Sequence, residues 1–211
     1  MSSHRLRIIG KIRLFYRLLA NIYPKIMAEK TALVILAEGA EEMEFVISVD
    51  VLRRAEVKVD VAGLAGISAV KCSRGVVITP DISLDDAASK KYDVVVLPGG
   101  KASWTLAESQ KVGDVIRQQE KEGRMVAAIC AAPIALNSHG VGIGKNVTSY
   151  PSVKDQLIEK FKYSEERVVV DGNLVTSRGP GTAFEFALTL VDKLVGKEVV
   201  EKLKKEMLTN F

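Results

Sequence analysis

The stretch 125-MVAAICAAPIALNSHG-140 places a run of small apolar residues directly before a helix-like pattern, with Cys130 at the junction. Five apolar residues, 125–129, have the length of a strand that is buried on both faces of a parallel sheet. The residues after Cys130 follow a helical pattern. A strand followed at once by a helix is the repeating unit of α/β folds.

The same alternation extends in both directions from this stretch. The sequence Asp171-Gly172 between two short strands is a strong hairpin signal, and Thr182 with Glu185 fits a capping box that starts a helix. The pattern therefore predicts a doubly wound α/β sandwich. The other predicted strands are 32–37, 57–63, 93–100, 168–170 and 173–177, with two short extended pieces in 70–80, and the other predicted helices are 41–55, 109–122, 182–195 and 197–208.

Composition indicates one soluble domain, which we expect over residues 31–211. The chain has 211 residues, of which 47% are hydrophobic and 27% charged, and a core of this size needs no disulfides. Its two cysteines are too few for a secreted disulfide scaffold, which favours free thiols in a reducing compartment. With two histidines and no paired cysteine or histidine motif, metal ligation is not indicated.

The positive net charge belongs to the first 28 residues, which hold six of the 30 basic residues and none of the 26 acidic ones. The rest of the chain is slightly acidic, so no nucleic-acid surface is expected on it. A basic, amphipathic, acid-free leader is typical of a mitochondrial presequence, and it is too short and charged to span a bilayer. The alternatives are a surface helix or a disordered leader. We expect a cytoplasmic protein, with mitochondrial targeting or a nuclear location as further options.

Cys130 is the first candidate for chemistry, because ligands of open α/β sheets bind beyond the carboxyl ends of the strands. A helix N-terminus directly after a thiol favours the thiolate. The arrangement of strand, sharp turn, nucleophile and helix is that of a nucleophile elbow. The alternative is that Cys130 is a small buried hydrophobic residue, as most lone cysteines are.

Two other strand ends are expected on the same edge of the sheet as Cys130. Gly99 and Gly100 offer backbone N–H groups to an oxyanion, although Pro-Gly-Gly also suits a simple turn. Glu41, Glu42 and Glu44 begin a helix, where they either cap it or supply an acid or base to the site.

His139 is not a plausible base for Cys130. It lies nine residues further along one predicted helix, half a turn off in direction and about 13 Å away. A packing or surface role is expected instead. The absence of a Cys–His pair argues against a cysteine protease or a glutaminase.

Six segments in order resemble the DJ-1 family of parkinsonism-associated protein deglycases, which lies within the larger class of PfpI-like proteins. The resemblance covers about residues 31–200. The segments are 32-ALVILAEGAEEMEF-45, 61-VAGLAG-66, 71-KCSRGVVITPD-81, 93-DVVVLPGG-100, 127-AAICAAP-133 and 175-VTSRGPGTAFEFAL-188.

The resemblance implies a homodimeric, flavodoxin-like doubly wound sandwich with a mostly parallel central sheet. It implies that Cys130 is the family's oxidation-prone cysteine, that Glu44 is the acid hydrogen-bonded to it, and that Gly99 and Gly100 form the backbone-donor loop. The residues that fall in segments similar to the family's dimer contacts and pocket rim are Arg54, Ser73, Arg74, Arg178 and Pro180.

The activity implied by the resemblance is cofactor-free conversion of methylglyoxal and glyoxal to hydroxy acids, with repair of early glycation adducts on proteins and nucleotides. In this mechanism Cys130 attacks the aldehyde and Glu44 shuttles the proton. A non-catalytic redox sensor that works through oxidation of Cys130, and a chaperone, remain open, and all three roles fit protection against oxidative stress. Cys72 is expected to be a packed thiol.

Two pocket positions depart from patterns in this family and its relatives. Tyr150 stands where the family often has histidine, and a phenol with a pKa near 10 is a poor base at neutral pH. This leaves Glu44 as the proton shuttle and predicts a weaker activity. Ala131 follows the nucleophile where peptidase-like relatives carry histidine, which argues against proteolysis.

Overall fold

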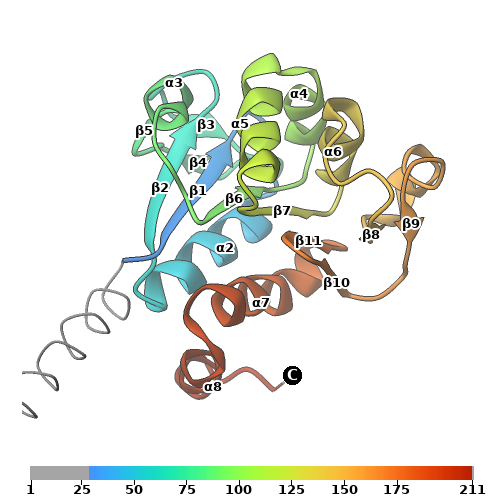
Figure 1. The fold of residues 1–211 in the computed structure, drawn as a ribbon. Helices are drawn as coiled ribbons and strands as arrows, with labels where there is room; N and C mark the ends of the chain where they lie inside the picture. The colour runs from blue at the N-terminus through green and yellow to red at the C-terminus, as the bar shows by residue number, and fades with distance from the viewer. Residues whose placement is uncertain (1–28, 211) are drawn as a thin grey trace, which may run out of the picture.

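The computed structural model describes residues 29–210 and contains a seven-stranded central sheet (Figure 1). Every pair of neighbouring strands in this sheet is parallel except β10 and β11, which form an antiparallel hairpin at one edge. The mostly parallel sheet predicted from the sequence is confirmed. In spatial order the strands are β10 (Val168–Asp171), β11 (Leu174–Ser177), β7 (Met125–Ile129), β6 (Val94–Leu97), β1 (Thr31–Leu36), β2 (Lys58–Gly63) and β5 (Ile82–Ser83).

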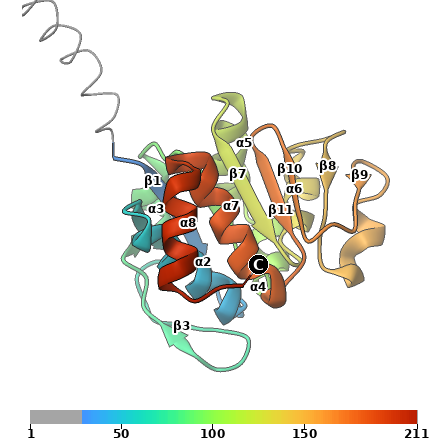
Figure 2. The same cartoon turned by 90° about the horizontal axis from the view of Figure 1, so that it is seen from below.

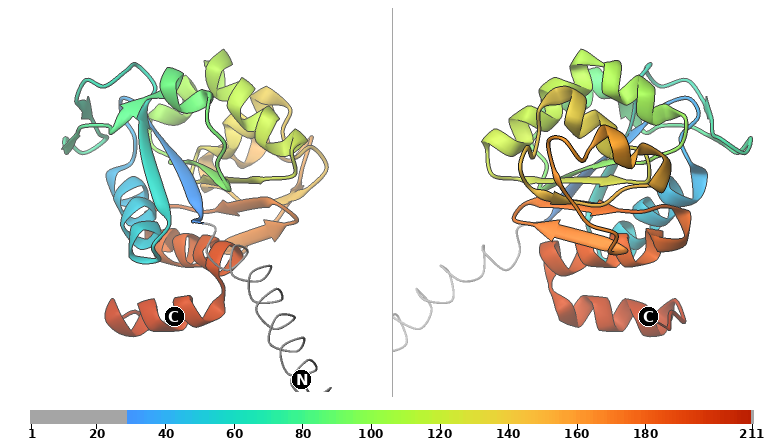
Figure 3. Two further views of the ribbon diagram at one scale, coloured as in Figure 1. Left: turned by 60° about the vertical axis from the view of Figure 1, so that its left-hand side comes forward. Right: turned by 90° about the vertical axis from the view of Figure 1, so that its right-hand side faces the viewer.

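Helices cover both faces of the sheet, which makes a three-layer sandwich (Figures 1 and 3). One face carries α3 (Leu84–Ala88), α4 (Ala102–Glu108), α5 (Gln110–Lys121) and α6 (Pro133–His139), and the other carries α2 (Glu42–Arg54) and α7 (Ala183–Val195). Seen from below, α8 (Lys197–Glu206) packs on the outer side of α7 (Figure 2).

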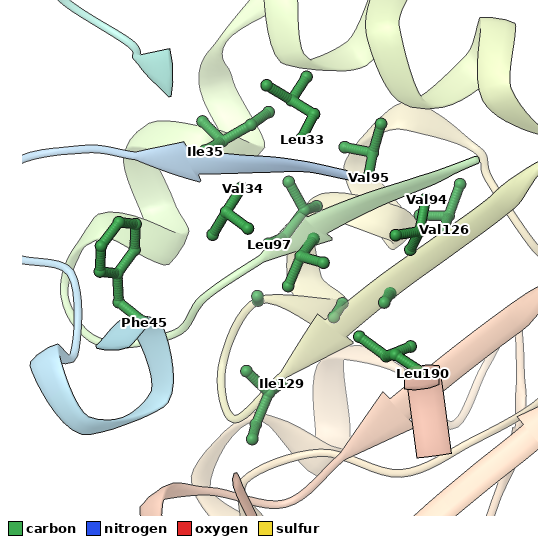
Figure 4. Close-up of a cluster of buried hydrophobic side chains, with 14 of the residues drawn as sticks. Leu33, Val34, Ile35, Phe45, Val94, Val95, Leu97, Val126, Ile129 and Leu190 are labelled. Atoms are coloured by element: carbon green, nitrogen blue, oxygen red, sulfur yellow. The ribbon is translucent and has the colours of Figure 1, made fainter. Parts of the chain in front are cut away.

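The core is apolar because the central strands are buried on both faces. Along β1, Leu33 and Ile35 point to one side of the sheet and Val34 to the other (Figure 4), and all three are almost fully buried. Successive side chains of a strand alternate between faces, so a strand between two helix layers must be apolar at every position. The run of apolar residues that predicted β1 is therefore a direct result of its place in the sandwich.

The predicted helix 109–122 corresponds to α5, and the structure adds α4 just before it, which the sequence analysis missed. Ser109 separates the two helices and caps α5, since its hydroxyl accepts a hydrogen bond from the backbone N–H of Val112 at 3.4 Å. The other missed elements are short: α3, β5, the pair β8 (Asn146–Val147) and β9 (Lys162–Tyr163), and the 3₁₀ helices Pro151–Gln156 and Pro180–Thr182.

The predicted capping box at Thr182 is wrong, although α7 does begin at the next residue. The Thr182 side chain makes no hydrogen bond to the first turn of α7. Its hydroxyl oxygen instead accepts from the backbone N–H of Gly179 at 3.1 Å, and the Glu185 carboxylate pairs with Arg167 at 2.6 Å. Thr182 thus stabilises the loop before the helix rather than the helix end.

The two extended pieces predicted in 70–80 form an antiparallel hairpin of β3 (Val70–Lys71) and β4 (Val77–Ile78). The predicted leader, 1–28, lies outside the described residues. Within residues 29–210, no helix is both long and apolar enough to span a bilayer. Over the same range, no three His, Cys, Asp or Glu side chains come together as a metal site would require.

Candidate active site

The carboxyl ends of three neighbouring strands bring the candidate residues together at one edge of the sheet. Cys130 directly follows β7, Gly99 and Gly100 follow β6, and Glu44 lies in the first turn of α2, the helix after β1. Because parallel strands end at the same edge, this convergence is a consequence of the topology.

Cys130 has a backbone conformation that is rare outside glycine, with φ at +66°. Two hydrogen bonds hold it: its N–H donates to the Ser177 carbonyl at 2.9 Å, and its carbonyl accepts from the Tyr150 N–H at 2.7 Å. Cys130 is therefore the sharp turn that the nucleophile-elbow pattern predicted. The expectation that a helix begins directly after it is wrong, because α6 begins at Pro133.

Glu44 is completely buried and lies against the Cys130 thiol. One carboxyl oxygen, Oε2, accepts a hydrogen bond from the Gly99 N–H at 2.8 Å. The other oxygen, Oε1, has no hydrogen-bond partner among the described residues. A Cβ atom at Gly99 would lie 2.5 Å from both Cys130 Cβ and Glu44 Oε2, so only glycine allows the acid and the thiol to approach.

Burial raises the pKa of the Glu44 carboxyl to about 7. Burial and the nearby Glu44 carboxylate raise the pKa of the Cys130 thiol to about 12, which is opposite to the low thiol pKa expected from the sequence. Between these two values the pair carries one negative charge, shared between the two groups. The thiolate forms when Glu44 keeps its proton, because repulsion from the carboxylate is then absent.

Backbone N–H groups of Gly100 and Ala131 point at the Cys130 sulfur and lower the pKa of its thiol. The sequence analysis expected Gly99 and Gly100 as the oxyanion donors. The structure differs at Gly99, whose N–H is used by Glu44. The N–H groups next to the sulfur are therefore those of Gly100 and Ala131.

The predicted rim residues fall into two groups. Tyr150 packs beside Gly179, close to Glu44, whereas Arg178 is turned to the Glu165 carbonyl, to which it donates at 2.9 Å. Pro180 begins the short 3₁₀ helix that follows Gly179.

The second group of rim residues lies near the β3–β4 hairpin and on α2. Ser73 Oγ donates to the Gly39 carbonyl at 2.6 Å and lies beside Gly100. Arg74 is exposed, and its backbone N–H donates to Glu42 at 2.7 Å. Arg54 is exposed in the last turn of α2 and pairs with Asp50 at 2.6 Å.

Glu41 and Glu42 have structural roles rather than the proton-transfer role considered for each of them. The Glu41 carboxylate caps α2 by accepting from the Glu44 N–H at 2.8 Å, and Glu42 anchors the β3–β4 hairpin through Arg74. Cys72 is buried, as expected for a packed thiol, and burial followed by nearby acids raises its pKa. His139 packs against α4 through a 2.9 Å hydrogen bond to the Leu106 carbonyl, as expected.

Residues 30–193 match the model of the DJ-1/PfpI family. The chain belongs to this family. Among curated DJ-1/PfpI proteins, the Drosophila melanogaster "Protein dj-1beta" is 59% identical over 86% of this chain and 98% of its own length. The Caenorhabditis elegans "Glutathione-independent glyoxalase DJR-1.2" is 41% identical over 85% of this chain and 97% of its own length.

The crystal structure of Drosophila melanogaster DJ-1beta superimposes with a TM-score of 0.85 at 58% identity. The comparison covers 87% of this chain and all of the fly chain. The flavodoxin-like DJ-1/PfpI fold is thereby confirmed for this protein.

Sequence reasoning missed two residues that shape the site. Ser177 supplies the carbonyl that fixes the Cys130 N–H, and Gly179 lies between Tyr150 and Glu44. Both belong to the segment 175-VTSRGPG-181, whose closely spaced glycines and proline signal an irregular loop at a strand end. The signal was present, but it does not tell which residues of the loop face the thiol.

The buried Glu44 predicts that the protein loses stability as the pH rises from the acid range toward neutrality. Its pKa is about 7 in the fold against an ordinary 4.5, so between these values the folded state binds more protons than the unfolded chain. The free energy of unfolding therefore falls as the pH rises from about 4.5 to about 7, by about 3 kcal/mol from this group alone. Urea unfolding of the wild type and of Glu44→Gln at pH 5 and pH 7.5 measures this. A stability difference between the two proteins that does not change with pH contradicts the prediction.

Proposed function

We propose that the protein is a glutathione-independent glyoxalase that converts small 2-oxoaldehydes to 2-hydroxy acids, and that the same site reverses early glycation adducts of these aldehydes. The observation that carries this proposal is the buried Cys130–Glu44 pair, which shares one charge above about pH 7. The family relative from Caenorhabditis elegans, named as a glyoxalase of this kind, supports it.

The reaction begins when the Cys130 thiolate adds to the aldehyde carbon of methylglyoxal. The alkoxide that forms lies near the N–H groups of Gly100 and Ala131, and it takes the proton held by neutral Glu44. The product of this step is a hemithioacetal, and Glu44 is left as a carboxylate.

Glu44 then acts as the base that isomerises the hemithioacetal. Its carboxylate removes the proton from C1, and the resulting enediol is reprotonated at C2 to give a lactoyl thioester on Cys130. Water hydrolyses the thioester, which releases lactate and restores the thiol. The sum is the addition of one water to methylglyoxal, so the electrons balance within the substrate and the steps call for no cofactor.

We also propose that the active form is a homodimer, paired through the outer side of α2 and the β3–β4 hairpin. In the single chain, large apolar side chains are exposed on these elements, at Met43, Val46, Val76 and Val77. Apolar groups gathered on adjoining elements are typical of a contact between subunits. Arg54 and Arg74 lie on the same two elements and belong to this proposed contact.

Lactate formation tests the proposed activity. Purified protein incubated with methylglyoxal, in buffer that contains no glutathione or other thiol, is expected to produce lactate in proportion to enzyme concentration. A parallel reaction tests the proposed reversal of glycation adducts. Its substrate is N-acetylarginine that has been treated with methylglyoxal and then freed of unreacted aldehyde, and lactate is again measured. No lactate above the protein-free rate would refute the enzymatic proposal.

A redox sensor is the second candidate, favoured by the buried Glu44 carboxyl beside the Cys130 sulfur. A protonated Glu44 is placed to donate a hydrogen bond to an oxygen added to that sulfur, which would stabilise sulfenic and sulfinic acids. Peroxide titration followed by intact-mass and peptide analysis is expected to place the first two oxygens on Cys130. Oxygens found first on Cys72 or on methionine would count against the sensor.

A further inference from the structure

Beside the Cys130–Glu44 pair, the Tyr150 ring and the unpaired oxygen of Glu44 both border Gly179. A Cβ atom at Gly179 would lie 3.4 Å from Cδ2 of the Tyr150 ring and 4.0 Å from Glu44 Oε1. Because Gly179 carries only a hydrogen atom on this side, it places no side chain between the Tyr150 ring and the Glu44 carboxyl.

The Tyr150 backbone is held in place although the residue is partly exposed. Its N–H donates to the Cys130 carbonyl at 2.7 Å, and its carbonyl accepts from Ser149 Oγ at 3.0 Å. Pro151 fixes the next residue at the start of a 3₁₀ helix. Tyr150 as a residue is 45% exposed, which leaves side-chain surface accessible to a ligand.

Glu44 contacts the Cys130 thiol and also faces Gly179, which in turn borders the Tyr150 ring. From an aldehyde carbon bound to the Cys130 sulfur, the side of the site formed by Gly179 and Tyr150 is therefore one direction in which the rest of a 2-oxoaldehyde can extend. In this orientation the substituent on the second carbon reaches the Tyr150 ring. A flat apolar substituent would cover the exposed ring, which gains both buried apolar area and offset stacking.

We propose that Tyr150 is a specificity-determining residue, which makes the site favour 2-oxoaldehydes with a flat apolar substituent, such as phenylglyoxal, over unsubstituted glyoxal. This inference rests on the proposed function, since it assigns the substrate preference of the same site. It gives Tyr150 a contact role through its ring and no role in proton transfer.

Substrate preference in three proteins tests this role. The measured quantity is kcat/KM for phenylglyoxal divided by kcat/KM for glyoxal, in the wild type, Tyr150→Phe and Tyr150→Ala. Loss of the ring is expected to lower this ratio about tenfold, and loss of the hydroxyl alone is expected to leave it unchanged within about twofold. An unchanged ratio in Tyr150→Ala overturns the proposal, and so does an equal fall in Tyr150→Phe.

A second measurement keeps the inference testable if no aldehyde is turned over. Cys130 is alkylated with 2-chloroacetophenone or with chloroacetone, where in each case the thiolate displaces chloride and forms a thioether. Each rate is divided by that of free N-acetylcysteine, and attachment to Cys130 is read by peptide mass. A preference for the phenyl ketone that disappears in Tyr150→Ala supports the aromatic contact even if the glyoxalase proposal fails. Equal normalised rates in all three proteins refute the contact itself.

Discussion

The Cys130→Ser variant is expected to form lactate from methylglyoxal more than about 1,000 times more slowly than the wild type, without loss of folding. Serine keeps the size of the side chain, so the turn held by Ser177 and Tyr150 remains. A serine hydroxyl does not ionise near neutral pH, and no histidine adjoins it as an activating base among the described residues. Lactate measured enzymatically without added thiols gives the result, and circular dichroism checks the fold.

Cys72→Ser is the matched control for this experiment. Cys72 is the other thiol of the chain, it is also buried, and it lies in the β3–β4 hairpin region away from the proton-transfer steps. Its variant is expected to keep most of the activity. If Cys130→Ser retains more than a tenth of the wild-type rate, the covalent mechanism is wrong, whatever the control shows.

The Glu44→Leu variant is expected to lose lactate formation by about 100-fold or more, since it removes the only acid that contacts the thiol in the described structure. Leucine cannot return a proton to the alkoxide or take one from C1. Cys130 remains, so slow binding of aldehyde to sulfur can persist. Rapid-quench mass analysis is expected to show a bound adduct that does not proceed to lactate. Turnover close to that of the wild type would refute the shuttle.

Alkylation of Cys130 by iodoacetamide separates the effect of Glu44 on the thiol from its effect on later steps. In the wild type the rate is expected to rise with pH and level off with a midpoint near 7, where the pair loses its first proton. In Glu44→Gln only the thiol of this pair titrates. The wild-type pair can lose its first proton from either group, so it loses that proton at a pH no higher than the thiol alone would. The midpoint of the alkylation rate in Glu44→Gln is therefore expected at a higher pH than in the wild type. A midpoint below that of the wild type would contradict the shared titration.

The fold was accessible from the sequence because apolar strands between two helix layers leave a simple pattern. β1, β6 and β7 are apolar at nearly every position, and each is followed by the residues that bend the chain toward a helix. Elements with few buried residues carried less signal. α4 escaped prediction because it is only seven residues long and directly precedes α5, and the predicted helix began at 109.

At the site, the sequence identified which residues lie together, but not which backbone N–H group donates to which acceptor. Gly99 and Gly100 are adjacent in the chain, yet one N–H faces Glu44 and the other the sulfur. That division depends on where the buried carboxyl lies, which no local pattern records. The same holds for the thiol pKa, because burial and Glu44 outweigh the effect of a helix that begins three residues later.

The shared charge of Cys130 and Glu44 has a consequence for how the site responds to the pH around it. With a first midpoint near 7, the reactive fraction of the pair changes only about twofold between pH 7 and pH 8, whereas an isolated thiol of ordinary pKa would change about eightfold. The neutral cytosol and the more alkaline mitochondrial matrix therefore present nearly the same nucleophile to a substrate. An active site of this design keeps its reactivity across this pH range without any change of residues.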